Sequence, residues 1–114
     1  MGPAIVIAAY RCRIENQEEL LQLLTDKRKY FLKAGYVTGR KPVIVRSRKD
    51  NEIMLEIFEW TSDKHTADAH NDPEVRKYWG RMDELCSGIG FPLSDIEEAN
   101  EPFAHFDPVN IPKK

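Results

Sequence analysis

EIFEWTSDKHTADAHNDPEVRKYW, which spans residues 56–79, joins the signal for a buried strand to the start of an amphipathic helix through a polar corner with two histidines. Residues 53–60 are a run of β-branched, aromatic and aliphatic side chains bounded by polar residues, which predicts a strand. Asp72 can cap the first amides of a helix, and Pro73 suits the first helical position. Between the two, residues 62–70 predict a short extra helical segment with His65 and His70 near its ends.

Apolar side chains follow Pro73 at steps of three and four, which predicts one apolar helical face that extends to residue 89. They are Val75, Tyr78, Trp79, Met82, Leu85, Cys86 and Ile89. Gly88 and Gly90 are expected to end this helix.

The other patterns predict a strand at residues 3–13, a helix at 17–33 that ends before Gly35, and a strand at 41–47. A tight turn at 49–52 makes the last of these a hairpin partner of residues 53–60, and a short final strand follows at 102–108. This order predicts a ferredoxin-like α+β fold, βαββαβ, with a four-stranded antiparallel sheet. We expect one domain over residues 1–114, with a core at 3–108 and a loose tail at 109–114.

Alternation along the two longest strands sorts their side chains onto two sheet faces. One face is aliphatic, with Ile5, Ile7, Ala9, Ile53, Leu55 and Ile57, and the other is mixed. Two helices cover only one face, and the mixed face would expose an apolar patch too large for a monomer, formed by Val6, Tyr10, Phe58 and Trp60. Pairing of that face with a second copy predicts a homodimer.

Composition excludes several classes of function. Seventeen basic against nineteen acidic residues give a net charge of −2, which supplies no electrostatic footprint for nucleic acid. No apolar run approaches the length of a membrane span. Cys12 and Cys86, without a CxxC motif, are typical of reduced buried thiols in a cytoplasmic protein.

The chain resembles the dimeric α/β-barrel proteins, specifically the antibiotic biosynthesis monooxygenase-like domains, over residues 3–108. The resemblance is carried by a strand that ends in an acidic-aromatic pair, a polar turn, a histidine step and a capped helix start: Glu59-Trp60, Thr61-Ser62-Asp63, Ala69-His70 and Asp72-Pro73-Glu74-Val75. It implies a cavity between sheet and helices or near the dimer face. It also implies, for some members, cofactor-free oxygenation of phenols or quinols.

Other members of that family degrade haem, with an Asn on the first strand and a haem-ligating His inside the second helix. Residues 4–13 contain no Asn here, and residues 75–85 contain no His, with Trp79 near the place of the ligand. Haem degradation is therefore not expected, and we predict no cofactor.

His70 and Glu56 are the candidate catalytic residues. His70 matches the family's histidine position before the second helix, where it could hydrogen-bond a phenolic ligand or cap backbone groups. Glu56 lies mid-strand among apolar neighbours, where an ionised carboxylate needs a partner. It could line a cavity and act as a base, or form an ion pair across the dimer face with an arginine of the second copy.

Aromatic side chains with a polar tip could bracket a planar ligand, although packing is their usual role. The candidates for substrate binding are Tyr10, Phe58, Trp60, Trp79 and His105. His105, on the final strand, would share the cavity with Tyr10 if the two edges of the sheet meet. His65 is expected to be exposed. The spacing of the acidic and histidine residues at 65–72 lacks the i, i+4 histidine pair of a helical metal site, so no metal is predicted.

The sequence therefore predicts a monooxygenase-like protein that binds a small aromatic ligand. Two alternatives remain open, namely a non-catalytic binding or structural protein of the same fold, and an isomerase or lyase in which Glu56 is the indispensable residue.

Overall fold

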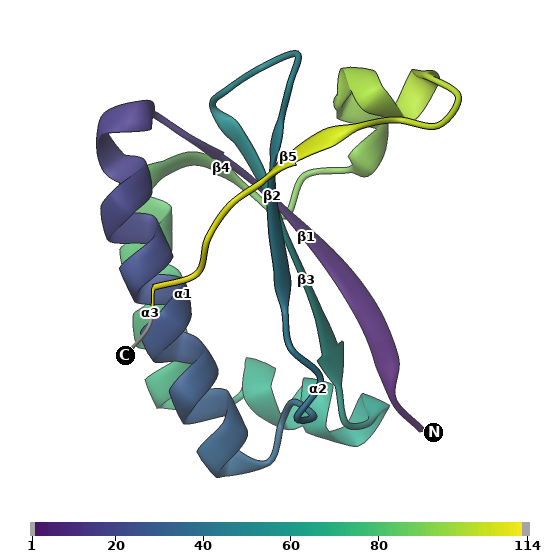
Figure 1. The fold of residues 1–114 in the computed structure, drawn as a ribbon. Helices are drawn as coiled ribbons and strands as arrows, with labels where there is room; N and C mark the ends of the chain where they lie inside the picture. Colours follow the sequence, from purple (N-terminus) through teal and green to yellow (C-terminus); the bar gives the residue numbers. More distant parts are fainter. Residues whose placement is uncertain (1, 113–114) are drawn as a thin grey trace.

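The computed structural model describes residues 2–112. Along the chain, the elements are β1 (Ala4–Cys12), α1 (Ile14–Ala34), β2 (Val43–Ser47), β3 (Ile53–Trp60), α2 (Asp63–His70), α3 (Pro73–Leu85) and β4 (Cys86–Ile89). Two short 3₁₀ turns, η1 (Leu93–Asp95) and η2 (Glu97–Asn100), precede β5 (Phe106–Pro108). Figure 1 shows α1 and α3 on one side of the sheet and the 3₁₀ turns on the other.

Within the described residues the sheet has five antiparallel strands in the order β4-β1-β3-β2-β5. The long pair β1 and β3 forms its centre, with Ala4 opposite Trp60 and Arg11 opposite Ile53. The prediction of four strands was therefore wrong in number, while the α+β class and the antiparallel pairing are confirmed.

The fifth strand comes from residues that we assigned to the second helix. α3 ends at Leu85, and Cys86 turns to extended backbone, with φ −112° and ψ 145°, to pair with Cys12 of β1. Cys86 and Ile89 continue the helical spacing, so the pattern alone could not locate this change. β4 therefore forms the edge of the sheet beside β1.

The final strand is shorter than predicted and lies at the other edge of the sheet. β5 pairs only with β2, with Ser47 opposite Phe106. The preceding residues form a turn in which Phe103 has a positive φ of 52°, so they cannot continue a strand. Residues 109–111 of the expected loose tail are packed, because Val109 bonds to the carbonyl of Ile44 and Ile111 contacts the core. Residues 113–114 lie outside the described part.

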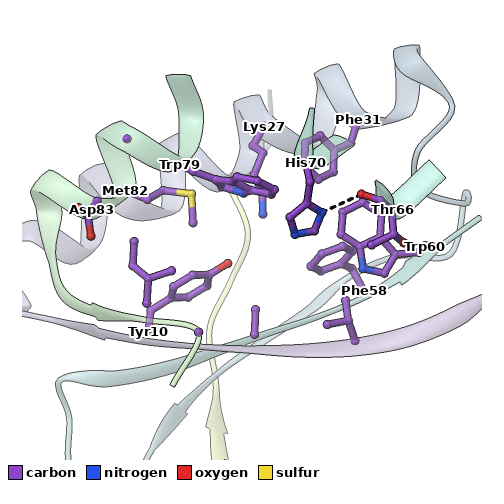
Figure 2. Close-up of a pocket in the computed structure, with 15 residues that line it drawn as sticks. Tyr10, Lys27, Phe31, Phe58, Trp60, Thr66, His70, Trp79, Met82 and Asp83 are labelled. Carbon is purple, nitrogen blue, oxygen red and sulfur yellow. Dashed lines mark hydrogen bonds between the residues drawn. The ribbon is translucent and has the colours of Figure 1, made fainter. Parts of the chain in front are cut away.

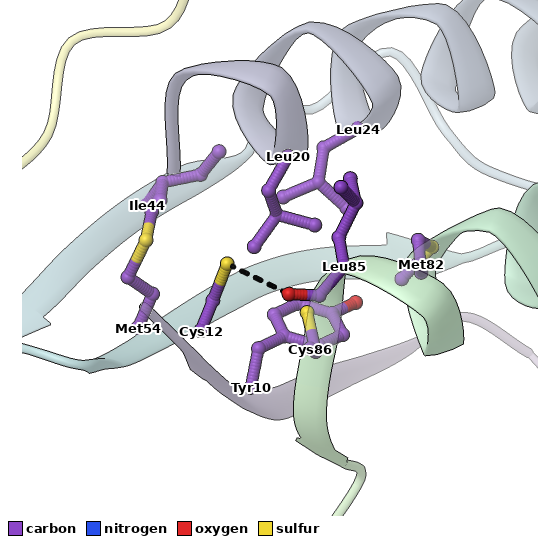
Figure 3. Close-up of a cluster of buried hydrophobic side chains, with 9 residues drawn as sticks. All are labelled: Tyr10, Cys12, Leu20, Leu24, Ile44, Met54, Met82, Leu85 and Cys86. Carbon is purple, nitrogen blue, oxygen red and sulfur yellow. Dashed lines mark hydrogen bonds between the residues drawn. The ribbon is translucent and has the colours of Figure 1, made fainter. Parts of the chain in front are cut away.

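The assignment of the sheet faces in the dimer prediction was also wrong. The mixed face packs beneath α1 and α3, where Tyr10 and Met54 meet Leu20, Leu24 and Met82 (Figure 3). Phe58 and Trp60 of the same face pack with Phe31 and Val75. Both faces carry many apolar side chains in the sequence, and the bulky aromatic ones lie in the wide space between helices and sheet.

The aliphatic face is the one that the helices leave uncovered. Ile96, between η1 and η2, packs on Ala9, Ile53 and Leu55 at one end of this face. At the other end Ile5, Ile7 and Val43 are 53%, 42% and 51% exposed. We refer to these three residues as the open aliphatic patch.

Local signals around the central stretch are confirmed. Ser62 accepts a hydrogen bond from the amide of His65 and so caps α2. Asp72 accepts from the amide of Glu74 at 2.9 Å, with Pro73 next to it at the start of α3. Cys12 and Cys86 are both buried and free. Among residues 2–112, no helix is long and apolar enough to cross a membrane.

Candidate functional site

A cavity of about 690 Å³ lies between the sheet and the three helices (Figure 2). Its volume falls in the range of roughly 300–1,000 Å³ that is typical of sites for small organic ligands. The lining is mostly apolar and comprises Val6, Ala8, Tyr10, Lys27, Phe31, Phe58, Trp60, Thr66, His70, Trp79, Gly80, Met82, Asp83, Ile89 and Gly90. The site is therefore an apolar chamber with a few polar groups.

His70, the last residue of α2, points into this cavity beside Trp79, with ring centroids 5.0 Å apart (Figure 2). Its Nδ1 lies 2.8 Å from the carbonyl oxygen of Thr66. A carbonyl only accepts, so Nδ1 carries the proton, and Nε2 of the neutral ring remains an acceptor. The predicted alternatives are thus compatible, because one nitrogen bonds the backbone and the other is available to a ligand.

The position of His70 is set by both ends of α2. The Ser62 cap fixes the start of the helix, and Arg76 of α3 donates to the carbonyl of His70 at 3.0 Å. A helix of eight residues is too short to be stable by itself, so these contacts hold the histidine against the cavity.

Lys27, Glu56 and Tyr10 form a second polar feature, which we call the Lys27 cluster. They are 2%, 4% and 3% exposed. The Lys27 ammonium and the Tyr10 hydroxyl both donate to Oε1 of Glu56, at 2.9 and 2.7 Å. Lys27 and Tyr10 line the cavity, whereas the described lining does not include Glu56. The carboxylate thus has the partners that a buried charge requires.

Aromatic rings surround the ammonium of Lys27. Its Nζ lies 5.2 Å from the ring centroid of Phe31 and 5.1 Å from that of Phe58, which are cation–π distances. Burial, followed by the negative charge of Glu56, raises the pKa of the Tyr10 phenol well above its ordinary value. Tyr10 therefore remains a hydrogen-bond donor at neutral pH.

The structure brings together Tyr10, Phe58, Trp60, His70 and Trp79 of the predicted site residues, all in the lining of one cavity. Glu56 lies directly behind them. Its predicted partner, an arginine of a second copy, was wrong, because Glu56 faces the helices and Lys27 of the same chain supplies the positive charge.

His105 does not share the cavity with Tyr10, which corrects the prediction. It is exposed and lines a separate surface depression with Arg48, Lys49 and Glu101. The cause is the strand order, since β5, which follows His105, pairs with β2, whereas Tyr10 lies on β1 next to β4. The two edges of the sheet do not meet.

His65 lies outside the cavity lining and contacts Thr61 and Tyr36, so it is partly buried rather than exposed. No group of three or more His, Cys, Asp or Glu in residues 2–112 is arranged to hold a metal ion.

Sequence reasoning missed Lys27, which entered only as one of the seventeen basic residues of the chain. Its burial was readable from spacing, because the buried side chains Leu20, Leu24, Lys27 and Phe31 recur at steps of three and four along α1. A lysine in an apolar register together with a glutamate in a buried strand is the signal that would have paired them.

Comparison with solved structures shows three proteins with similar folds. A Bordetella bronchiseptica protein described as a "putative antibiotic biosynthesis monooxygenase" has a TM-score of 0.65 at 13% identity, covering 77% of this chain and 89% of that chain. A Bacteroides thetaiotaomicron protein of unknown function, described as a "possible oxidoreductase", has a TM-score of 0.63 at 13% identity, covering 77% and 93%. A conserved Methanosarcina mazei protein has a TM-score of 0.63 at 15% identity, covering 77% and 85%.

No family model matches the chain, and no curated protein sequence matches it. At these identities, the structural likeness establishes the fold. The protein adopts the fold of the antibiotic biosynthesis monooxygenase-like domains that its sequence resembles.

Proposed function

We propose that the protein is a cofactor-free monooxygenase that binds a small phenol or quinol in the cavity between sheet and helices. The observation that carries the proposal is the state of His70, whose Nδ1–H is held by the Thr66 carbonyl while the ring points into an aromatic-lined cavity. Nε2 is then the group that accepts a proton from a ligand hydroxyl. Trp60, Trp79, Phe58 and Tyr10 hold the ring of the ligand.

The chemistry needs no external reductant. Deprotonation by His70 gives a phenolate, which transfers an electron to dioxygen more readily than the phenol does. For a phenol, one oxygen atom then bonds to the ring carbon opposite the hydroxyl and the other leaves as water, so that phenol and O₂ become a quinone and H₂O. A quinol is attacked at a free ring carbon instead, so that quinol and O₂ become a hydroxyquinone and H₂O. The substrate supplies all four electrons.

Oxygen uptake with a panel of electron-rich phenols and quinols tests the proposal. His70→Ala is expected to lower turnover by at least about a hundredfold, the lower range for loss of a general base. His65→Ala is the matched control, because His65 belongs to the same helix but does not line the cavity. Unchanged turnover in His70→Ala would contradict the assignment, provided that circular dichroism shows both variants to be folded.

Two other functions give different results in the same assay. A non-catalytic binding protein would bind the phenols without oxygen uptake. An isomerase or lyase would depend on Glu56 rather than His70, but the carboxylate of Glu56 is engaged by Lys27 and Tyr10 and lies outside the described cavity lining. This arrangement supports the oxygenase over the Glu56-dependent reaction.

The proposal includes a homodimer through the sheet, with a revised interface. The open aliphatic patch of Ile5, Ile7 and Val43 is apolar and exposed, and self-association about a two-fold axis would bury it.

A further inference from the structure

The Lys27 cluster pairs one ammonium with one carboxylate at the wall of the cavity. A buried ion pair is weak support for stability, because apolar residues of similar volume often replace it without loss. Yet Lys27 places an ammonium at the cavity wall, with its tip directed at the space below α1 (Figure 2). A lysine in such a place is positioned to contact the contents of the cavity.

The ammonium keeps donors for a ligand. A lysine has three N–H donors, and its described hydrogen bond, to Oε1 of Glu56, uses one. The faces of Phe31 and Phe58 stabilise the positive charge through their ring quadrupoles. They offer no lone pair, so an oxygen atom in the cavity would be a far better acceptor for the remaining N–H groups.

Tyr10 prepares the cluster to receive a negative group. Its hydroxyl donates to the same Oε1 of Glu56 that Lys27 contacts, so the charge of the carboxylate is shared between two donors. The ammonium is therefore not saturated by Glu56. Among the described lining residues, Lys27 is the single Lys or Arg, and Asp83 is exposed.

We propose that Lys27 receives an acidic oxygen of the ligand, so that the cavity selects planar aromatic compounds with an ionised phenol, enol or carboxylate over neutral analogues of the same shape. This inference rests on the proposed function, because it assigns the class of ligand for the same cavity. In the oxygenation, Lys27 would stabilise the anion that forms when His70 removes the proton.

Two matched pairs of probes test the selection. The first is 2-hydroxy-1,4-naphthoquinone, an ionised enol at neutral pH, against its 2-methoxy analogue, which cannot ionise. The second is 2-naphthoate against 2-naphthamide. We expect the ionised member of at least one pair to bind at least about tenfold more tightly to the wild-type protein, as measured by calorimetry and by quenching of Trp60 and Trp79. The pair that shows the preference identifies whether an enolate or a carboxylate supplies the ligand oxygen atom that Lys27 contacts.

The variant K27M/E56Q removes both charges together. The amide oxygen of the glutamine at position 56 can still accept the hydrogen bond from the Tyr10 hydroxyl. The variant is expected to bind the ionised and neutral probes equally, whereas His70→Ala keeps the preference. Equal binding in the wild type, no binding of either ionised probe, or a preference that survives in K27M/E56Q would overturn the inference. The wild-type comparison needs no variant, so it stands even if K27M/E56Q fails to fold.

Failure of this inference can be told apart from failure of the proposed function. Oxygen uptake that depends on His70 without any anion preference would remove only the role of Lys27. An anion preference that depends on Lys27 without oxygen uptake would leave a binding protein for aromatic anions.

Discussion

The two faces of the sheet are similarly apolar in sequence but differ in what is buried among their apolar side chains. The helix-covered face contains the Lys27 cluster and a cavity of about 690 Å³. The opposite face carries the open aliphatic patch and, near η1 and η2, a smaller cavity of about 220 Å³ lined almost entirely by apolar side chains. Apolar character alone therefore does not mark the candidate site. A buried carboxylate does not mark it either, because Glu98 is 2% exposed and lines the smaller cavity, where Ser47 and the amides of Arg48 and Lys49 bond its oxygens. The helix-covered face differs in that a buried ammonium, that of Lys27, lies at the wall of its cavity.

The largest expected effect is a loss of unfolding free energy when the ion pair on the helix-covered face is broken. Lys27→Met leaves the Glu56 carboxylate buried without its counter-charge, which is expected to cost about 3–5 kcal/mol of unfolding free energy. This is a large share of the roughly 5–15 kcal/mol that holds a domain of ordinary size. Urea unfolding measures the loss.

The control for Lys27→Met is K27M/E56Q, which removes the unpaired charge and should recover most of the stability. A single variant that is as stable as the wild type would mean that Glu56 takes up a proton or reaches solvent. In that case the stability of the helix-covered face would not depend on its buried ion pair.

Much of the fold was readable from the sequence because its strongest signals are local. The strand at residues 53–60, the Asp72 cap and the end of α1 at Gly35 all follow from side chains within a few positions. The change from helix to strand at Cys86 was not readable. Its apolar spacing suits either structure, and pairing with Cys12, 74 positions earlier, decides between them.

The candidate site was predictable in the same partial way. His70 was singled out because it matches the histidine position of the family that the sequence resembles, and Trp60 and Tyr10 because aromatic residues in strands are a local feature; all three line the cavity. The side of the sheet that the helices cover depends on packing volumes across the whole layer, so the face assignment failed. Lys27 was missed because lysines were considered for their charge alone, and not for their position in the apolar repeat of the helix.

The second effect concerns the open face. Ile7→Glu would place a charge in the proposed dimer interface and is expected to weaken association by about a hundredfold or more. Leu32→Glu is the matched control, because Leu32 on α1 is 43% exposed and Ile7 is 42% exposed. Sedimentation equilibrium measures both. A wild-type protein that is monomeric at about 0.1 mM, or equal effects of the two substitutions, would contradict the dimer.

The smallest effect is a pH dependence to which all four tyrosines contribute, and all four lie on the helix-covered side. Their pKa values are all raised: that of Tyr10 chiefly by burial, that of Tyr30 to about 12 and that of Tyr36 by hydrogen bonds to Asp72, and that of Tyr78 by burial.

A raised pKa means that the native state holds its proton where the unfolded chain has lost it, so the stabilisation is complete below about pH 10 and declines as the pH rises above it. The buried thiols of Cys12 and Cys86 also have raised pKa values and lose their stabilisation from about pH 9 upward. The melting temperature should therefore begin to fall near pH 9 and fall more steeply above pH 10, and tyrosinate absorbance should appear together with the loss of near-ultraviolet circular dichroism. Tyr10→Phe removes one of the four phenols and should make the decline shallower. A tyrosinate signal with a midpoint near pH 10 in a protein that is still folded would show that one of these rings is open to water, and the helix-covered layer would then be less tightly closed than its contacts imply.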